Sequence, residues 1–196
     1  MSASVLSAVG AVVLGYLLGS IPTGVLLARR HGVDLRRVGS GNIGATNVAR
    51  ALGKRMGVIV LVLDALKGLA AVGIASALGE PDPVRAGVGM AAVLGHLFPI
   101  WLRLHGGKGV ATSVGVLLGL VPAAGAAAAI AYLIVYATTR TSSRGSLAAS
   151  AAALLAAPFV ARSWPGVVLP AALFCTILVT HRDNVRRLLR GEEGRV

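Results

Sequence analysis

The stretch Arg37–Arg50, RVGSGNIGATNVAR, carries residue types that bind oxyanions. Its glycines allow the backbone to approach a ligand closely, so successive N–H groups can point at one anion. Small hydroxyl and amide side chains stand beside the glycines, and an arginine at each end supplies fixed positive charge. The stretch therefore predicts a site for a phosphate or a similar anion.

Three further polar clusters interrupt an otherwise apolar chain. They are His105–Ser113 (HGGKGVATS), Thr138–Ser146 (TTRTSSRGS) and His181–Asn184 (HRDN). Together with the first stretch they offer arginine, lysine, hydroxyl and amide groups but few carboxylates, which is an inventory suited to phosphate. The four clusters are the candidate site.

The GGKG segment resembles the end of a nucleotide-binding P-loop, but the spacing of that motif is absent. Gly109, rather than serine or threonine, follows Lys108, and no aspartate stands nearby to hold Mg²⁺. This pattern argues against nucleotide hydrolysis. No Cys/His set and no multi-carboxylate set is present either, so we expect no metal and no cofactor.

Several of these side chains also have simpler interpretations. Lys108 is either a phosphate ligand or an interfacial lysine. His181 is a general base, a phosphate ligand or an interfacial histidine. Ser143 and Ser146 are either phosphate donors or ordinary helix N-caps.

Composition defines the environment of this site. The chain has 196 residues, 56% of them hydrophobic and 13% charged, and its mean hydropathy is +0.80. A soluble fold cannot cover so much apolar surface, so we expect a single all-α, polytopic membrane domain over residues 1–196. The net charge is +12, but aromatics are only 4% and the cations lie in short loops, which argues against nucleic-acid binding.

The apolar runs predict seven transmembrane helices. One run of 28 residues is too long for one comfortable span, and Pro122 interrupts it, so we divide it near 121–123. A kink is expected in the first span at GSIPTG, where freed backbone groups need polar partners. The expected spans are Val5–Ala28, Met56–Leu78, Val84–Leu104, two helices within Val110–Ala137, Leu147–Ala161 and Gly166–Thr180.

Lysine and arginine set the orientation. Of the 19 cations, the seven-span arrangement places 16 on one side, two (Arg85 and Arg162) on the other, and Lys67 within a span. The positive side is cytoplasmic, so the N-terminus lies outside and the C-terminus inside. All four polar clusters then share the cytoplasmic face. Asp64 and Lys67 lie three residues apart in the second span. They either pair with each other or position the residues of the site without contacting the ligand.

The motifs GSIPTG, GSGNIGATNVAR, DALKG, GHLFPIWLRLHGGKGVATS, TRTSSRGS and HRDNVRRLLRGEE occur in an order and spacing that resemble the acyl-phosphate-dependent glycerol-3-phosphate acyltransferases of bacterial membranes, the PlsY family. The resemblance covers nearly the whole chain. It implies seven helices in the bacterial cytoplasmic (inner) membrane with the active site at the cytoplasmic face. It also implies acyl transfer from acyl phosphate to the 1-position of sn-glycerol 3-phosphate, giving lysophosphatidic acid and phosphate.

The resemblance also implies roles for individual residues. The catalytic set that it implies is Lys108, Ser143, Ser146, His181 and Asn184, with Glu193 completing the last motif. The substrate-binding set is Ser40, Gly41, Asn42, Thr46, Asn47, Arg50, Gly106 and Gly107. Backbone N–H groups near Gly106 and Gly107 are expected to stabilise an oxyanion. The expected partners are glycerol 3-phosphate, a long-chain acyl phosphate and the lipid bilayer, with a monomeric protein.

Two other classes of function compete with this one. A transporter for a phosphorylated metabolite would explain the cationic loops and broken helices, but it predicts internal repeats and polar residues at mid-membrane. No convincing repeat is present, and only Asp64 and Lys67 lie deep. A non-catalytic membrane scaffold would not explain why four polar clusters lie on one face.

Overall fold

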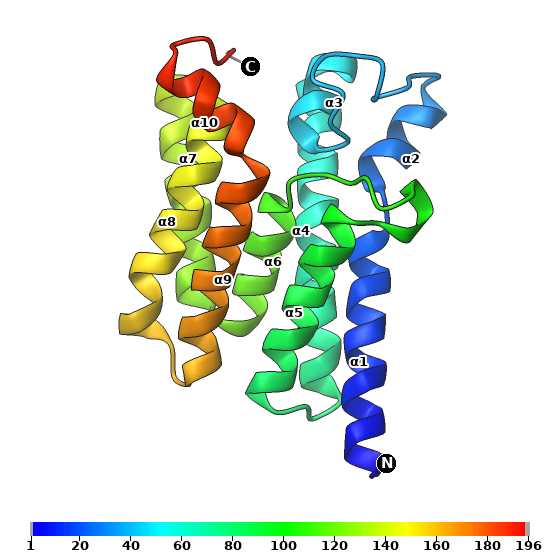
Figure 1. Cartoon of the computed structure of the whole chain (residues 1–196), viewed down its shortest axis with the longest axis vertical. Helices are drawn as coiled ribbons and strands as arrows, with labels where there is room; N and C mark the ends of the chain where they lie inside the picture. The colour runs from blue at the N-terminus through cyan, green and yellow to red at the C-terminus, as the bar shows by residue number, and fades with distance from the viewer. Residues whose placement is uncertain (1, 195–196) are drawn as a thin grey trace.

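The computed structural model describes residues 2–194, and within that range the chain is helical, with no strand. The helices form one upright bundle with the two termini at opposite ends (Figure 1). Short helices α2, α3 and α10 gather at the end away from the N-terminus. The helices are α1 Ala3–Ser20, α2 Thr23–Arg30, α3 Ala45–Leu52, α4 Lys54–Ala77, α5 Asp82–Leu97, the 3₁₀ helix Ile100–Leu102, α6 Val110–Leu120, α7 Pro122–Thr139, α8 Ser142–Val160, α9 Trp164–Thr180 and α10 Arg182–Leu189.

The predicted division of the long apolar run is confirmed. α6 ends at Leu120, and α7 begins at Pro122, where the proline occupies the first turn of a helix and needs no N–H partner. α6 has only 11 residues. It begins part-way along the bundle, while its neighbours α4 and α7 extend past it toward the end that carries α3 and α10 (Figure 1).

Within residues 2–194, five helical segments are long and apolar enough to cross a bilayer, or six if the bent pair α9–α10 is one span. The first of these is the continuous segment Ala3–Arg30, which contains both α1 and α2. α6 is too short for that test. Seven spans and the direction of the termini therefore stay predictions. One cation of the charge count, Arg195, lies outside the described residues.

The kink expected at GSIPTG is confirmed between α1 and α2. Pro22 caps α2, and the Ile21 carbonyl accepts hydrogen bonds from the Thr23 N–H at 3.1 Å and from Lys67 Nζ at 3.0 Å. Thr23 Oγ1 donates to Asp64 Oδ1 at 2.6 Å. The ion pair of Asp64 and Lys67 is confirmed at 2.9 Å, and both side chains are buried. The pair thus joins α4 to the break in the first span.

Two polar stretches between the expected spans were expected to be loops, but they are partly helical. Arg37–Arg50 contains the first turns of α3, which Gly44 caps in an extended conformation. Thr138–Ser146 is reduced to a two-residue connection, because Thr139 still belongs to α7 and Ser142 already belongs to α8. Arg140 makes this tight turn with a left-handed backbone, φ 54°.

Glycines set the closest helix contacts in the bundle. A Cβ on Gly115 of α6 would lie 1.8 Å from the Ala65 carbonyl oxygen of α4, and one on Gly19 of α1 would lie 1.9 Å from the Ala92 oxygen of α5. Small residues at these positions bring backbones together where the hydrophobic effect does not drive association. The Gly115 contact holds α6 against α4, and the Gly19 contact holds α1 against α5.

Gly115→Ala is therefore expected to lower the unfolding free energy by about 1–3 kcal/mol, since the methyl group meets a backbone atom that cannot turn aside. Gly73→Ala, in α4 with open space around its Cα, is the matched control. It is expected to be neutral or to stabilise by about 0.5–1 kcal/mol. Thermal unfolding in detergent measures both, and equal effects would contradict the packing role of Gly115.

Candidate active site

A cavity of about 790 Å³ opens among α3, α4, α6, α7, α8 and α10. All five predicted catalytic residues line it, and so do five of the predicted binding residues. These ten residues are Lys108, Ser143, Ser146, His181, Asn184, Ser40, Asn42, Thr46, Asn47 and Arg50. Gly41, Gly106 and Gly107 do not line it. The structure thus brings the four polar clusters into one site.

The Arg37–Arg50 stretch is built around a buried amide. Asn47 is 1% exposed. Its Oδ1 accepts the Ser40 N–H at 2.9 Å, and its Nδ2 donates to the Leu35 and Val38 carbonyls, each at 3.0 Å. Gly39 next to it has φ 56°, and a Cβ there would lie 2.3 Å from Asn47 Oδ1. Asn47 therefore shapes the loop with the hydrogen bonds it already makes, although its surface also reaches the cavity.

Thr46 and Arg50 lie one turn apart on α3 and so share a face of that helix. Thr46 Oγ1 is 2.8 Å from Ser142 Oγ, which is in turn 3.1 Å from the Tyr132 hydroxyl of α7. This chain of hydroxyls crosses the cavity. Sequence analysis missed Ser142 and Tyr132. Ser142 belongs to the predicted serine cluster, whereas Tyr132 lies in an apolar run with no signal besides a hydroxyl that needs a partner.

The glycine segment before Lys108 packs against the end of α5. The Gly106 N–H donates to the Leu97 carbonyl at 2.9 Å, and the Gly107 N–H donates to the His96 carbonyl at 3.1 Å. The expectation that these two N–H groups are available to an oxyanion was therefore wrong. The N-terminus of α6 follows directly, and helix N-termini present N–H groups without a partner inside the helix. Gly109, Val110 and Ala111 of that turn line the cavity.

Lys108 reaches across the cavity to α10, where its Nζ donates to Asn184 Oδ1. Burial lowers the pKa of the Lys108 ammonium, and the nearby charge of Glu193 partly offsets that effect. Asn184 Nδ2 donates to Glu193 Oε1 at 2.6 Å. A network thus joins the loop before α6 to the chain beyond α10.

Glu193 is the acceptor at the centre of this network. Ser143 Oγ donates to its Oε1 at 2.7 Å, and Arg187 Nε donates to its Oε2 at 2.6 Å. Burial alone would raise the pKa of Glu193, but the hydrogen bonds from Asn184, Ser143 and Arg187 outweigh it and hold the pKa below its usual value. Side chains that can hold a carboxylate in this way can also hold a phosphate.

The two serines of the third cluster differ in their partners. Ser146 Oγ donates to the Ser142 carbonyl at 2.9 Å within α8, whereas Ser143 Oγ points to the Glu193 carboxylate. Thr141, not either serine, is the N-cap residue of α8. The geometry therefore favours Ser143 as the anion donor.

His181 lies at the junction of α9 and α10 and is 3% exposed. Burial, together with the positive charge of Lys108, lowers its pKa from 6.5 to about 4. Its Nδ1 is 3.0 Å from the Ile177 carbonyl and therefore carries a proton. At neutral pH the ring is uncharged, and Nε2 is free to accept a proton or a hydrogen bond.

The depressed pKa of His181 predicts a pH dependence of stability. Between pH 6.5 and about pH 4 the unfolded chain binds a proton that the folded protein does not, so stability falls as pH falls through this window. A shift of this size corresponds to about 3 kcal/mol. Unfolding temperatures of wild type and His181→Gln between pH 7 and pH 4.5 measure it. A variant with the same pH slope as wild type would contradict this source.

Comparison with known proteins agrees with this geometry. The model of the family described as glycerol-3-phosphate acyltransferase matches residues 9–191. The chain belongs to this family. A relative from Myxococcus xanthus, named glycerol-3-phosphate acyltransferase, is 55% identical over 186 residues, which cover 94% of this chain and 97% of the relative. One from Geobacter sulfurreducens, with the same name, is 47% identical and covers 93% and 94%.

Two solved structures of the acyltransferase family have the same fold. The integral membrane glycerol 3-phosphate acyltransferase PlsY in its glycerol 3-phosphate form superposes with a TM-score of 0.92 at 40% identity, covering 97% of this chain and 96% of that one. Its lysophosphatidic acid form gives a TM-score of 0.90 at 39% identity, covering 96% and 95%. This chain is accordingly an acyltransferase that is integral to the membrane.

Proposed function

We propose that this acyltransferase moves an acyl group from acyl phosphate to the 1-hydroxyl of sn-glycerol 3-phosphate, releasing lysophosphatidic acid and phosphate. The observation that carries the proposal is that one cavity joins a cationic end to an apolar end. The cationic end holds Arg50, Lys108 and Arg187. Related structures named for their glycerol 3-phosphate and lysophosphatidic acid forms support the acceptor and the product.

The apolar end of the cavity suits an acyl chain. Leu61 and Ala65 of α4, Val114 of α6 and Ala129 and Leu133 of α7 line it. Leu61 and Leu133 are 36% and 62% exposed. The cavity therefore reaches the lipid-facing surface, and a chain can lie between helices while its headgroup stays at the polar end.

The reaction needs no covalent enzyme intermediate, because acyl phosphate is already activated. The glycerol 1-hydroxyl oxygen attacks the acyl carbonyl carbon, the bond from that carbon to the phosphate oxygen breaks, and phosphate leaves. The hydroxyl proton goes to His181 Nε2 or to a substrate phosphate. Lys108, Arg50 and Ser143 hold phosphate charge, and the first turn of α6 adds N–H donors.

The remaining features of the proposal concern the membrane. The protein has seven spans in the bacterial cytoplasmic membrane, with the C-terminus and the active site facing the cytoplasm, and acts as a monomer. Its cation distribution supports this orientation. Single cysteines at Ser163 and Arg190, in a Cys175→Ser background, test it with a membrane-impermeant maleimide on spheroplasts. Labelling of position 190 rather than 163 would overturn the orientation.

The test of activity uses purified protein in lipid. Phosphate release from palmitoyl phosphate is measured with and without glycerol 3-phosphate, beside a parallel reaction with palmitoyl-CoA. Release that depends on glycerol 3-phosphate, with lysophosphatidic acid formed and no use of the CoA ester, is expected. Turnover of palmitoyl-CoA in place of palmitoyl phosphate would overturn the donor. No turnover by folded protein would overturn the reaction, and glycerol 3-phosphate uptake into proteoliposomes would then test transport.

A further inference from the structure

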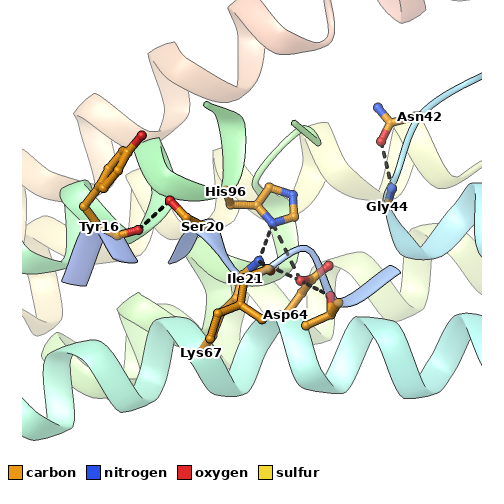
Figure 2. A network of polar contacts seen from close by, with 9 residues as sticks. Tyr16, Ser20, Ile21, Asn42, Gly44, Asp64, Lys67 and His96 are labelled. Carbon is orange, nitrogen blue, oxygen red and sulfur yellow. Dashed lines mark hydrogen bonds and ion pairs between the residues drawn. The ribbon is translucent and has the colours of Figure 1, made fainter. Parts of the chain in front are cut away.

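Behind the GGKG segment lies a buried polar cluster that the mechanism above does not use. It consists of Lys67 and Asp64 of α4, His96 of α5, and the Ile21 carbonyl at the break in the first span (Figure 2). Lys67 Nζ is 2.9 Å from Asp64 Oδ1, 3.0 Å from the Ile21 oxygen and 2.8 Å from His96 Nδ1. A lysine ammonium has three N–H donors and no acceptor. Each proton of Lys67 therefore has one acceptor.

This arrangement determines the protonation state of the His96 ring. If Lys67 donates to Nδ1, that nitrogen carries no proton, and a neutral imidazole then bears its proton on Nε2. Asp64 does not compete for Nδ1. Its Oδ1 lies 3.6 Å away, beyond hydrogen-bond range, and is occupied by Thr23 and Lys67. With Nδ1 accepting from Lys67, the ring proton lies on Nε2, which is then a hydrogen-bond donor.

The Nε2 side of the ring lies toward the GGKG segment. Figure 2 shows Nδ1 turned toward Lys67 and the second ring nitrogen on the opposite side. His96 lines the same cavity as Lys108 and Arg50. Gly107 lies directly beside it, because a Cβ on Gly107 would be 2.2 Å from Nε2. Glycine at this position lets the loop lie against the ring of His96, which is 6% exposed.

We propose that His96 is a further catalytic residue, whose Nε2–H donates a hydrogen bond to a negatively charged oxygen of the bound substrate. This proposal rests on the proposed acyl transfer. The oxygen belongs either to the donor phosphate or to the tetrahedral intermediate at the carbonyl carbon. The donor replaces the Gly106 and Gly107 N–H groups, which the end of α5 has already engaged. Lys67 and Asp64 are positioning residues that act through His96.

Two substitutions separate the roles of the two ring nitrogens. In His96→Asn the amide oxygen can take the place of Nδ1 as acceptor for Lys67, but the shorter side chain has no donor at the position of Nε2. In His96→Gln the amide nitrogen reaches that place as a donor. We expect His96→Asn to unfold near the wild-type temperature and to lose about 10²-fold in rate. His96→Gln is expected to retain more activity than His96→Asn, and the exposed His31→Asn to match wild type.

The kinetic constants identify the oxygen that His96 contacts. A fall confined to kcat indicates the tetrahedral intermediate, whereas a rise confined to the KM for palmitoyl phosphate indicates the donor phosphate. Either result supports the proposal. His96→Asn activity within tenfold of wild type would overturn it. The proposal would also be overturned if His96→Gln were less active than His96→Asn and if the activity losses followed the unfolding temperatures. A histidine with a purely structural role gives that pattern.

A measurement on the unaltered side chain covers the case in which His96→Asn does not fold. Nitrogen NMR of histidine-labelled wild-type protein in lipid nanodiscs is expected to show one ring protonated at Nε2 whose signal shifts when palmitoyl phosphonate binds. Loss of that signal in His96→Gln assigns it. An unprotonated Nε2, or a signal that the phosphonate leaves unchanged, would overturn the proposal. Formation of lysophosphatidic acid by the wild-type protein is measured in parallel. If it is formed while the His96 tests fail, the role of His96 is wrong and the proposed function stands.

Discussion

Lys108→Ala is expected to reduce kcat/KM by at least about 10²–10³-fold while leaving the fold intact. Lys108 is the cation that reaches from the loop before α6 to Asn184 of α10, and under the proposed function it holds a substrate phosphate. Alanine removes its charge and its hydrogen bond together. The initial rate of lysophosphatidic acid formation in lipid, measured across both substrate concentrations, gives the change.

Two variants serve as controls for this result. Lys54→Ala removes an exposed lysine at the start of α4 and is expected to leave kcat/KM unchanged. Lys108→Arg keeps the charge but changes its shape, so partial activity is expected. If Lys108→Ala keeps more than about a tenth of wild-type kcat/KM, a loss under about 1.4 kcal/mol, the assignment of Lys108 as phosphate anchor is wrong.

Lys67→Met is expected to have the largest effect on stability, a loss of about 3–5 kcal/mol, because it leaves the Asp64 carboxylate buried without its partner. The substitution also removes the ammonium group that donates to the Ile21 carbonyl at the break between α1 and α2. Thermal or denaturant-induced unfolding in detergent micelles measures the loss.

The double variant Asp64→Leu with Lys67→Met tests whether the unpaired charge is the cause. Replacing both members of a buried ion pair with apolar groups costs less than removing one of them. The double variant is therefore expected to be more stable than Lys67→Met alone, although the Thr23 hydroxyl lacks its acceptor and the Ile21 carbonyl keeps only the Thr23 N–H. Equal stability of the two variants would show that the lost hydrogen bonds, rather than the charge, dominate.

The sequence predicted much of the fold because its signals are local. Pro122 divides a run that is too long for one helix, and Pro22 with its neighbours marks the break in the first span. Asp64 and Lys67 are three residues apart, so their pairing on one helical face needs no tertiary information. The gathering of four polar clusters in one cavity was also predicted, since charge asymmetry places them on one side of the membrane.

What the sequence did not predict depends on contacts between distant segments. Gly106 and Gly107 look like free anion-binding backbone, and only their packing on Leu97 and His96 reveals that their N–H groups are engaged. Asn47 looks like a ligand for the same reason, although its amide shapes the loop around it. The role proposed for His96 requires knowing which ring nitrogen Lys67 contacts, and no spacing along the chain encodes that contact.

The short length of α6 has a consequence for how the rate depends on substrate supply. The helix begins part-way along the bundle. The cavity is lined by Leu61 and Leu133 and by residues of α3 and α10. Under the proposed function, the apolar part opens to the lipid and the polar part to water. Acyl phosphate then arrives by diffusion within the bilayer, and glycerol 3-phosphate arrives by diffusion through water. Diluting the bilayer with inert lipid at constant total donor is therefore expected to slow the reaction, while saturation by glycerol 3-phosphate continues to follow its molarity. The mole fraction of donor in the membrane would then control the first committed acylation.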